Sequence, residues 1–225
     1  MRRMVLSVTF GAFIWLVTAI CADAETLDGY GNESRTVLGL RVSPSAAQAW
    51  LPAPWLVNPI GTGPSKDANL IFIFINPWLF QDSESKPTSA PIDRQVGFGI
   101  PGKHPQTGET GFFVARVYHS DPNAAPGPYK NSIPVATVRA EQTLKGAGLE
   151  PATGSEVWEV RDAAGGTIEL RLQYQRGVPS RIKAENKPRS AVEPNFFRIY
   201  RVDQGVDVVK ACRPASTASS STLSE

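Results

Sequence analysis

The sequence predicts a mainly β (α+β) domain built as an antiparallel β-barrel with one or two short helices. Several segments alternate apolar and polar residues with the period of a strand. Turns rich in glycine and proline separate these segments, and only one segment carries both start and stop signals of a helix. A closed barrel is favoured because closure leaves no exposed strand edges. Parallel α/β layering is disfavoured because too few helical segments lie between the strands.

The first elements are a helix and a buried strand. Ser43 is a good N-cap, Pro44 fits the first helical position, and Pro52 closes the segment, which predicts a helix between them. The run from Leu70 to Ile75 is apolar throughout, which is typical of a central strand buried on both faces.

The later strands follow in sequence as "RQVGFGIP", "GFFVARVYHS", "IPVATVRAEQ", "SEVWEVRD", "TIELRLQYQ" and "NFFRIYRVD". Gly97 and Gly99 in the first of them indicate a bend or a close contact. The turn 163–166 between "SEVWEVRD" and "TIELRLQYQ" predicts a hairpin. In "NFFRIYRVD", Phe197 and Ile199, with Arg201 as a further candidate, are expected to share one side.

The two ends of the chain predict an exported protein with a polar tail. Arg2 and Arg3 precede an apolar stretch, and Ala22-Asp23-Ala24 fits a cleavage site, so residues 1–24 are predicted to be a cleaved signal peptide. The expected location is periplasmic or secreted, with residues 25–212 as the domain and residues 213–225 as a disordered tail. An uncleaved anchor is the alternative, but the apolar stretch is short for a bilayer.

Composition excludes several classes of function. The formal charge of the chain is only +2, which gives no electrostatic reason to expect a nucleic acid or an anionic membrane as partner. Cys212 is the only cysteine that would remain after cleavage, so no intramolecular disulfide is expected. With His104 and His119 the only histidines, neither a metal nor another cofactor is expected. The chain also lacks a G-x-S-x-G motif, so nothing supports a lipase-like hydrolase.

Three segments resemble the acetoacetate decarboxylase-like family when they are taken in order. "LRVSPSAAQAWLPAPWLV" resembles its early strand, helix and LP-x-P turn. "GFFVARVYHSDPNAAPGPYKNSIPVATV" is similar to its central strand and lysine-bearing loop, and "EPNFFRIYRV" resembles a later strand. The resemblance spans roughly residues 35–210 and implies a mostly antiparallel barrel around a small-molecule cavity.

In that family a reactive lysine forms a Schiff base with a ketone substrate, which requires a neutral amine. The family pattern has a proline followed by two lysines, whereas this chain has Pro128-Tyr129-Lys130. Counting back from Pro134 places Tyr129 at the nucleophile's position and Lys130 at its cationic neighbour's. A slip of one residue makes Lys130 the candidate catalytic amine. The two pocket glutamates of the family have no counterparts in the matching strands.

The other candidate ligand-binding residues are Tyr129, Arg35, Trp78 and Phe80. Arg35 could clamp a carboxylate, and Trp78 and Phe80 could wall an apolar cavity. Each has an ordinary structural alternative as a surface charge or a packed aromatic residue. His119 beside Asp121 suggests an acid–base pair, although "HSDPN" also reads as a turn.

Two kinds of function remain open from the sequence. The first is a protein that binds a small, partly apolar carbonyl or carboxylate compound in its barrel, with lyase chemistry through Lys130 as an open question. The second is a non-catalytic periplasmic carrier or sensor, or an envelope interaction protein. A small-molecule ligand is the expected partner, no membrane contact is expected after signal cleavage, and a homo-oligomer is possible.

Overall fold

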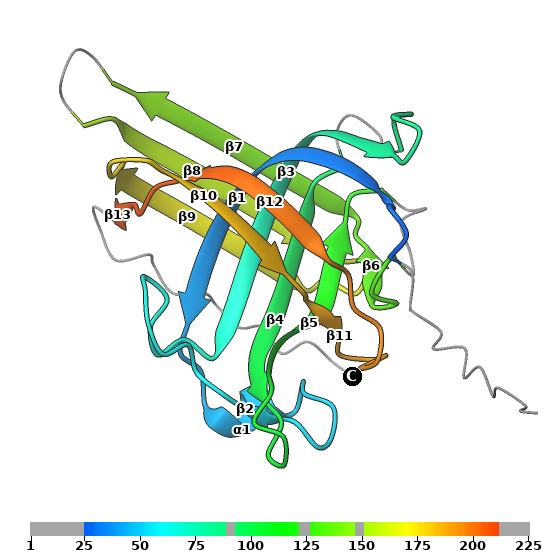
Figure 1. Ribbon diagram of the computed structural model, residues 1–225. Coiled ribbons are helices and arrows are strands. Elements are labelled where there is room, and N and C mark those ends of the chain that lie inside the picture. The colour runs from blue at the N-terminus through cyan, green and yellow to red at the C-terminus, as the bar shows by residue number, and fades with distance from the viewer. Residues whose placement is uncertain (1–24, 89–92, 122–126, 147–150, 212–225) are drawn as a thin grey trace, which may run out of the picture.

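The computed structural model describes residues 25–88, 93–121, 127–146 and 151–211, which form a mainly β structure with one short helix (Figure 1). The predicted mainly β class is therefore confirmed. The predicted signal peptide at residues 1–24 and the predicted tail at residues 213–225 lie outside the described residues. No helix among the described residues is long and apolar enough to cross a membrane.

Sheet A is the largest sheet and has seven strands. Its order is β1-β3-β4-β5-β11, with β2 added to β4 and β6 added to β5. The pairs within β1-β3-β4-β5 are antiparallel, whereas β6 and β11 both run parallel to β5. The strands are β1 (Gly29–Leu40), β2 (Leu56–Val57), β3 (Leu70–Asp82), β4 (Gln95–Lys103), β5 (Thr110–His119), β6 (Ser132–Pro134) and β11 (Arg189–Ser190).

Two smaller sheets complete the structure. Sheet B has the order β13-β9-β8-β7, and a two-stranded ribbon pairs β10 with β12. Their strands are β7 (Thr137–Lys145), β8 (Thr153–Arg161), β9 (Thr167–Gln175), β10 (Ser180–Asn186), β12 (Tyr200–Val206) and β13 (Lys210–Ala211).

The predicted closure into a barrel is not found among the described strands, which form three separate sheets. The path through sheet A ends at β1 and at β11, and β11 is only two residues long. The ribbon strands β10 and β12 pair with each other and with no strand of sheets A or B. The edges are therefore covered by packing and short added strands, and not removed by closure.

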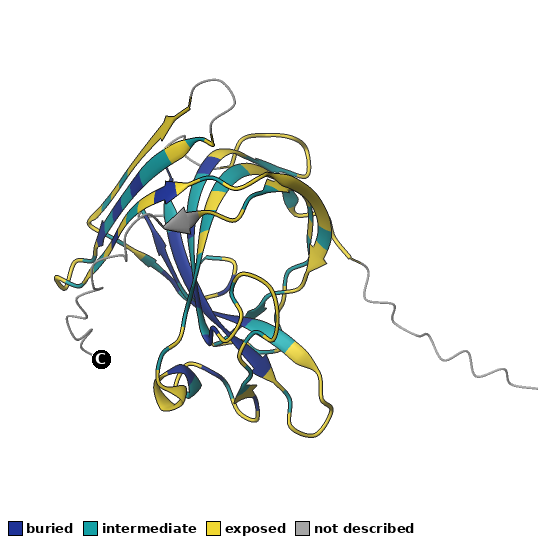
Figure 2. Ribbon diagram, turned by 90° about the vertical axis from the view of Figure 1, so that its left-hand side faces the viewer, coloured by how far each residue is buried: buried dark blue, intermediate teal, exposed yellow. Residues whose placement is uncertain are grey.

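Sheets A and B pack face to face over the main hydrophobic core, and Figure 2 shows buried segments in both sheets. Phe74 of β3 and Trp158 of β8 lie at its centre, with ring centroids 5.5 Å apart. The hairpin β8–β9 brings Leu170 into the same core, as the alternation in "TIELRLQYQ" predicts. The run 70–75 lies in β3 between β1 and β4, so its central position in the sheet is confirmed.

The helix α1 (Pro44–Gln48) covers one end of sheet A. The Ser43 side chain accepts a hydrogen bond from the amide of Ala46 at 3.2 Å, which confirms the predicted N-cap. Ala47, Leu51 and Trp55 pack against Phe113 of β5 in a second core cluster. The helix ends at Gln48, a few residues before the predicted stop.

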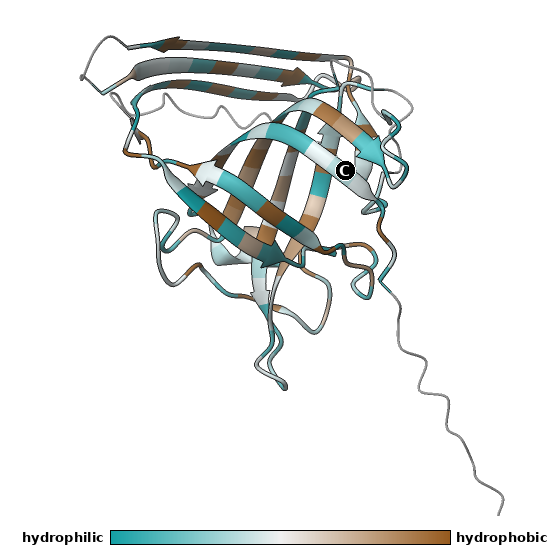
Figure 3. Cartoon of the chain, turned by 45° about the horizontal axis from the view of Figure 1, so that its top comes forward, coloured by the Kyte–Doolittle hydropathy of each residue, from teal (hydrophilic) through white to brown (hydrophobic). Residues whose placement is uncertain are grey.

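The other face of sheet A is covered by the ribbon, and we call it the ribbon face. Figures 1 and 3 show β10 and β12 crossing in front of sheet A. Val114 and Val117 of β5 pack on this face with Tyr129 and Tyr200, and Tyr200 begins β12. Residues of the ribbon alternate between hydrophilic and hydrophobic (Figure 3), with one apolar side and one side of paired charges such as Arg181 with Asp203.

Two predicted strands differ from the structure. "IPVATVRAEQ" divides into β6 and β7, which belong to sheets A and B respectively. The chain changes sheets just after Pro134, whose nitrogen cannot donate a ladder hydrogen bond. "NFFRIYRVD" forms a strand only from Tyr200 onward, so Phe197 and Ile199 lie before the strand.

We expect Gly99→Ala to lower the free energy of unfolding by about 2 kcal/mol, because overpacking a buried site typically costs about 1–3 kcal/mol. A Cβ at Gly99 would lie 2.5 Å from the Phe113 carbonyl oxygen and 2.5 Å from Cζ of Phe112. Gly97→Ala is the matched control on the same strand, since its Cβ would meet nothing closer than 3.7 Å. Urea unfolding of both variants measures the difference. Equal stability of the two variants would contradict the close contact at Gly99.

Candidate functional site

Tyr129 and Lys130, which are neighbours in the loop before β6, lie at two different surfaces of the molecule. Tyr129 is only 6% exposed and packs on the ribbon face with Val114 and Val117. Lys130 is exposed, and it is one of the residues that line a separate cavity beside α1. The Tyr129 carbonyl oxygen accepts a hydrogen bond from Oγ of Ser190 at 2.6 Å, which fixes the loop. The loop residue that enters the protein interior is therefore Tyr129.

Tyr129 forms a hydroxyl pair with Tyr200. Its Oη donates to Oη of Tyr200 at 3.2 Å, and the Phe196 ring packs edge-on with a centroid distance of 6.2 Å. Burial raises the pKa of the Tyr129 phenol above its usual range, the nearby Tyr200 raises it further, and Arg35 acts in the opposite direction. The Tyr129 phenol is thus neutral at physiological pH. Because Tyr129 donates to Tyr200, the hydroxyl hydrogen of Tyr200 is left for another acceptor.

Arg35 belongs to the same face as the tyrosines. It pairs with Ile75 across β1 and β3, two residues along each strand from the pair Val37 and Ile73 and therefore on the same face. The row of that pair continues through Gly97 to Val117. Arg35 forms an ion pair with Glu33, and its side chain is 34% exposed. The structure thus brings two of the sequence-predicted ligand residues, Arg35 and Tyr129, to one face of sheet A.

Tyr200 was not anticipated as a site residue. The sequence expectation for "NFFRIYRVD" placed Phe197 and Ile199 on one side of a longer strand. The strand instead begins at Tyr200, which faces Tyr129. A tyrosine within an otherwise alternating segment is an ordinary strand residue, so only the fold identifies it.

The two predicted aromatic wall residues lie elsewhere. Trp78 is 71% exposed on β3. The Phe80 ring covers the backbone of Gly31 on β1, where a Cβ would lie 2.8 Å from two of its ring carbons. Neither residue lines either of the two cavities described below.

A cavity of about 430 Å³ lies between α1, β5 and β6, and we call it the Trp50 cavity. Its volume is in the range of small-molecule sites. Arg116 of β5 stands over the Trp50 ring, 5.0 Å from the centroid. The full lining is Ala49, Trp50, Leu51, Pro52, Ala115, Arg116, Lys130, Asn131, Ser132, Ile133, Ala191 and Val192.

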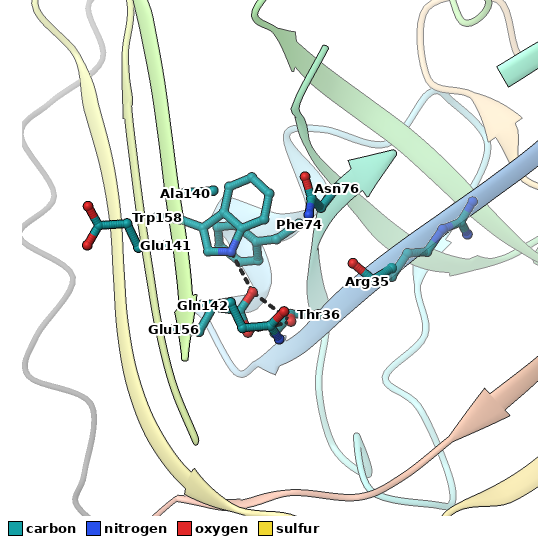
Figure 4. Close-up of a pocket in the computed structure, with 10 residues that line it drawn as sticks. Arg35, Thr36, Phe74, Asn76, Ala140, Glu141, Gln142, Glu156 and Trp158 are labelled. Atoms are coloured by element: carbon teal, nitrogen blue, oxygen red, sulfur yellow. Dashed lines mark hydrogen bonds between the residues drawn. The ribbon is translucent and has the colours of Figure 1, made fainter. Parts of the chain in front are cut away.

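A smaller cavity of about 80 Å³ lies between sheets A and B beside a buried carboxylate, and Figure 4 shows it. Glu156 of β8 is 5% exposed and accepts hydrogen bonds from Nε1 of Trp158 at 2.5 Å and from Oγ1 of Thr36 at 2.7 and 2.9 Å. The side chains of Arg35 and Glu141 point away from Glu156 (Figure 4). Two protein donors, the Thr36 hydroxyl shared between both oxygens and the Trp158 indole, satisfy much of this carboxylate, so the cluster links the two sheets.

His119 lies beside Asp93, the residue two positions before β4. Its Nδ1 is 3.4 Å from Oδ2 of Asp93, and both residues are at least nine-tenths buried. Burial tends to raise the pKa of Asp93, but contacts with His119, Gln95 and the Asp121 amide together hold it below its usual range. The acid–base pairing considered from sequence joined His119 to Asp121; the structure supplies Asp93 as a carboxylate partner.

The described residues contain no group of three or more histidine, cysteine, aspartate or glutamate side chains that could hold a metal ion. The features above therefore define a mainly β small-domain protein with a tyrosine–arginine face and a separate cation-lined cavity.

Comparisons with known proteins give one distant structural neighbour to report. No protein-family model matches the chain. No curated protein matches it either. Among solved structures, the chain is similar to an acetoacetate decarboxylase-like enzyme from Sphingomonas wittichii RW1, with 12% identity and a TM-score of 0.41. The match covers 80% of this chain and 84% of the other. The description of this neighbour names the family that three segments of the sequence resemble.

We expect the stability of the protein to fall above pH 10 because Tyr129 must ionise on unfolding. The folded-state pKa of Tyr129 is raised, so its stabilisation is complete below the unfolded pKa near 10 and is lost as pH rises further. The loss from this residue is about 1.4 kcal/mol per pH unit. Urea unfolding at pH 9 and 11 measures it, and Tyr129→Phe should show a smaller loss over that interval. An identical loss in the variant would exclude Tyr129 as its source.

Proposed function

We propose that this protein binds a small, partly apolar carbonyl or carboxylate compound on the ribbon face of sheet A, without Schiff-base chemistry. The observation that carries the proposal is the opposite placement of Tyr129 and Lys130. At the position where the acetoacetate decarboxylase-like pattern has its reactive lysine, a tyrosine enters the interior. Export to the periplasm or beyond is part of the proposal and is supported by the N-terminal sequence alone.

The polar groups on this face suit an oxygen acceptor. The hydroxyl hydrogen of Tyr200 and the guanidinium of Arg35 both supply donors, and Glu33 occupies only part of the Arg35 fork. A carbonyl or carboxylate oxygen accepts from such donors without any proton transfer. Tyr129 remains protonated, so it supports Tyr200 as a fixed donor and does not act as a base.

Apolar side chains surround these donors. Val37 of β1 is 55% exposed and Ile182 of β10 is 40% exposed. By strand register Val37 lies on the ribbon face, and Ile182 lies on the same side of the ribbon as Tyr200. The carbon skeleton of a ligand would cover this exposed apolar surface, which favours a partly apolar compound.

Lyase chemistry through Lys130 is the alternative. It needs a buried amine that faces a bound ketone. Lys130 is exposed and lines the Trp50 cavity, whereas the interior position is taken by Tyr129. This placement favours a binding protein over a decarboxylase.

Reduction by borohydride in the presence of acetone distinguishes a binding protein from a lyase that acts through Lys130. We expect the intact mass of the protein to stay unchanged, because every lysine whose burial the structure describes is exposed and none is an interior amine that could form an imine. Free lysines react slowly with ketones, so the control is the same treatment of Lys130→Gln. An adduct on the wild-type protein that is lost in Lys130→Gln would establish the lyase alternative.

Binding itself is tested by calorimetry with acetoacetate, which carries both acceptor groups. We expect Tyr200→Phe and Arg35→Gln each to weaken binding by about tenfold, since one hydrogen bond to a charged ligand is worth about 1.5 kcal/mol. Trp78→Phe is the control, because Trp78 is 71% exposed and is not part of the cluster of Tyr129 and Tyr200. Unchanged affinity in both variants would refute the ribbon-face site.

A further inference from the structure

The Trp50 cavity carries two positive charges and no negative one. Arg116 and Lys130 line it, and no aspartate or glutamate is among its lining residues. Within the described part of the chain, neither cation forms an ion pair with a carboxylate. Many other arginines of this protein form ion pairs with carboxylates. Arg116 and Lys130 differ from them because they line one cavity together and have no carboxylate partner among the described residues.

The two cations come from adjacent backbone segments. Strand β6 runs parallel to β5 with Ser132 opposite Val117, and the Val117 amide donates to the carbonyl of Asn131 at 3.3 Å. Arg116 directly precedes Val117, and Lys130 directly precedes Asn131. This hydrogen bond therefore places Arg116 and Lys130 near one wall of the cavity. Arg116 is held over the Trp50 ring, which limits where its guanidinium can point.

The backbone at Lys130 is held in an uncommon conformation. Its φ is 58°, in the left-handed region that residues other than glycine and asparagine rarely adopt. Its amide donates to the carbonyl of Gly127 at 3.1 Å, and Ser190 fixes the preceding residue. Such conformations persist where the surrounding structure holds them, and they concentrate at ligand sites.

Two polar atoms beside Lys130 lack partners among the described residues. They are Oδ1 of Asn131 and Oγ of Ser132, and Ser132 is only 8% exposed. Both residues line the cavity. Buried polar atoms are nearly always hydrogen-bonded, so an unpaired hydroxyl in a cavity wall points to a missing acceptor.

We propose that the Trp50 cavity binds a small organic dianion with an apolar carbon skeleton. One acidic group pairs with Arg116 and the other with Lys130, and the Ser132 hydroxyl donates to an acidic oxygen. The skeleton lies against Leu51, Pro52 and Ile133. This site is on the opposite side of the Tyr129–Lys130 loop from the ribbon face, so it is independent of the proposed function above.

Calorimetric titration with adipate tests the proposal, with hexanoate as the ligand of similar length and single charge. We expect adipate to bind one site per chain, and hexanoate to bind about tenfold more weakly, because loss of one charged hydrogen bond costs about that factor. Hexanoate that binds as tightly as adipate would overturn the two-cation site. Failure of adipate to bind at millimolar concentration would overturn it as well.

Variants locate the site. Lys130→Gln and Arg116→Gln should each weaken adipate binding by about tenfold, and Arg116→Lys should recover part of the loss because it keeps the charge. Lys183→Gln on β10 is the control for a general charge effect, since its side chain is 70% exposed on the ribbon. Circular dichroism of each variant shows that the fold is retained. Adipate affinity that is unchanged in both glutamine variants would place the anion elsewhere.

The variant Tyr200→Phe separates this inference from the ribbon-face site. It should weaken acetoacetate binding and leave adipate binding unchanged. If Tyr200→Phe weakens both ligands equally, the two bind at one site and the second site is refuted. If Lys130→Gln and Arg116→Gln weaken adipate binding and no variant weakens acetoacetate binding, the Trp50 cavity stands and the ribbon-face proposal fails.

Discussion

Glu156→Ala is expected to lower the free energy of unfolding by about 4 kcal/mol, because it leaves one buried and one partly buried donor without an acceptor and opens a space between the sheets. The Nε1 hydrogen of Trp158 and the hydroxyl of Thr36 both donate to Glu156 in the wild-type protein. Trp158 is 2% exposed, so water cannot replace the lost acceptor without opening the core. Urea unfolding at pH 7 measures the change.

Glu141→Ala is the control for this prediction. Glu141 lines the same small cavity, but its side chain is 59% exposed and points away from Glu156 (Figure 4). Its ion pair with Arg139 is at the surface, where such pairs contribute about 0–1 kcal/mol. Thr36→Val should cost less than Glu156→Ala because it leaves the Trp158 hydrogen bond in place. A Glu156→Ala variant as stable as Glu141→Ala would show that the carboxylate does not link the two sheets.

The local periodicity of the sequence predicted the inner faces of sheet B. In "TIELRLQYQ" the apolar residues Ile168, Leu170 and Leu172 all pack on the main core, as a period of two requires. The helix start at Ser43 was likewise predictable, because capping depends on the chemistry of a few neighbouring residues.

The arrangement of the sheets was not predictable in the same way. Barrel closure depends on which edges meet over long distances, and no local pattern encodes that pairing. The strand β10 was missed because "SRIKAEN" is mostly polar and exposed, and its pairing with β12 becomes visible only in the fold. Ion pairs such as Arg181 with Asp203 join residues 22 positions apart in the sequence.

In the candidate site, too, the local sequence does not determine which residue is buried. Tyr129 and Lys130 are adjacent, and which of them enters the interior depends on the register of the following strand. Counting back from Pro134 placed Tyr129 at the nucleophile's position of the family pattern, and in the structure Tyr129 is the buried residue of the two. The contact with Tyr200 joins residues 71 positions apart, so the hydroxyl pair could not be read from either segment alone.

A second buried carboxylate, Asp93, ties the end of β5 to the start of β4. Its Oδ2 accepts from Nε2 of Gln95 at 2.9 Å and lies 3.4 Å from Nδ1 of His119. Its Oδ1 accepts from Oγ of Ser120 at 3.3 Å and from the Asp121 amide at 3.4 Å. With 5% exposure, the carboxylate depends on these protein groups in place of water.

Asp93→Ala should therefore lower the free energy of unfolding at pH 7 by about 3–5 kcal/mol, the usual cost of removing one member of a buried pair. The folded-state pKa of Asp93 is lowered, so its stabilisation is present above the unfolded pKa near 4 and is lost as pH falls through the folded value. The gap between wild type and Asp93→Ala should accordingly narrow below pH 4. Urea unfolding at pH 7, 5 and 3 measures this gap, with Asp203→Ala on β12, whose side chain is 46% exposed, as the comparison. A gap that stays constant down to pH 3 would mean that Asp93 contributes through its shape alone, and the charge on this carboxylate would then have no part in joining the two strands.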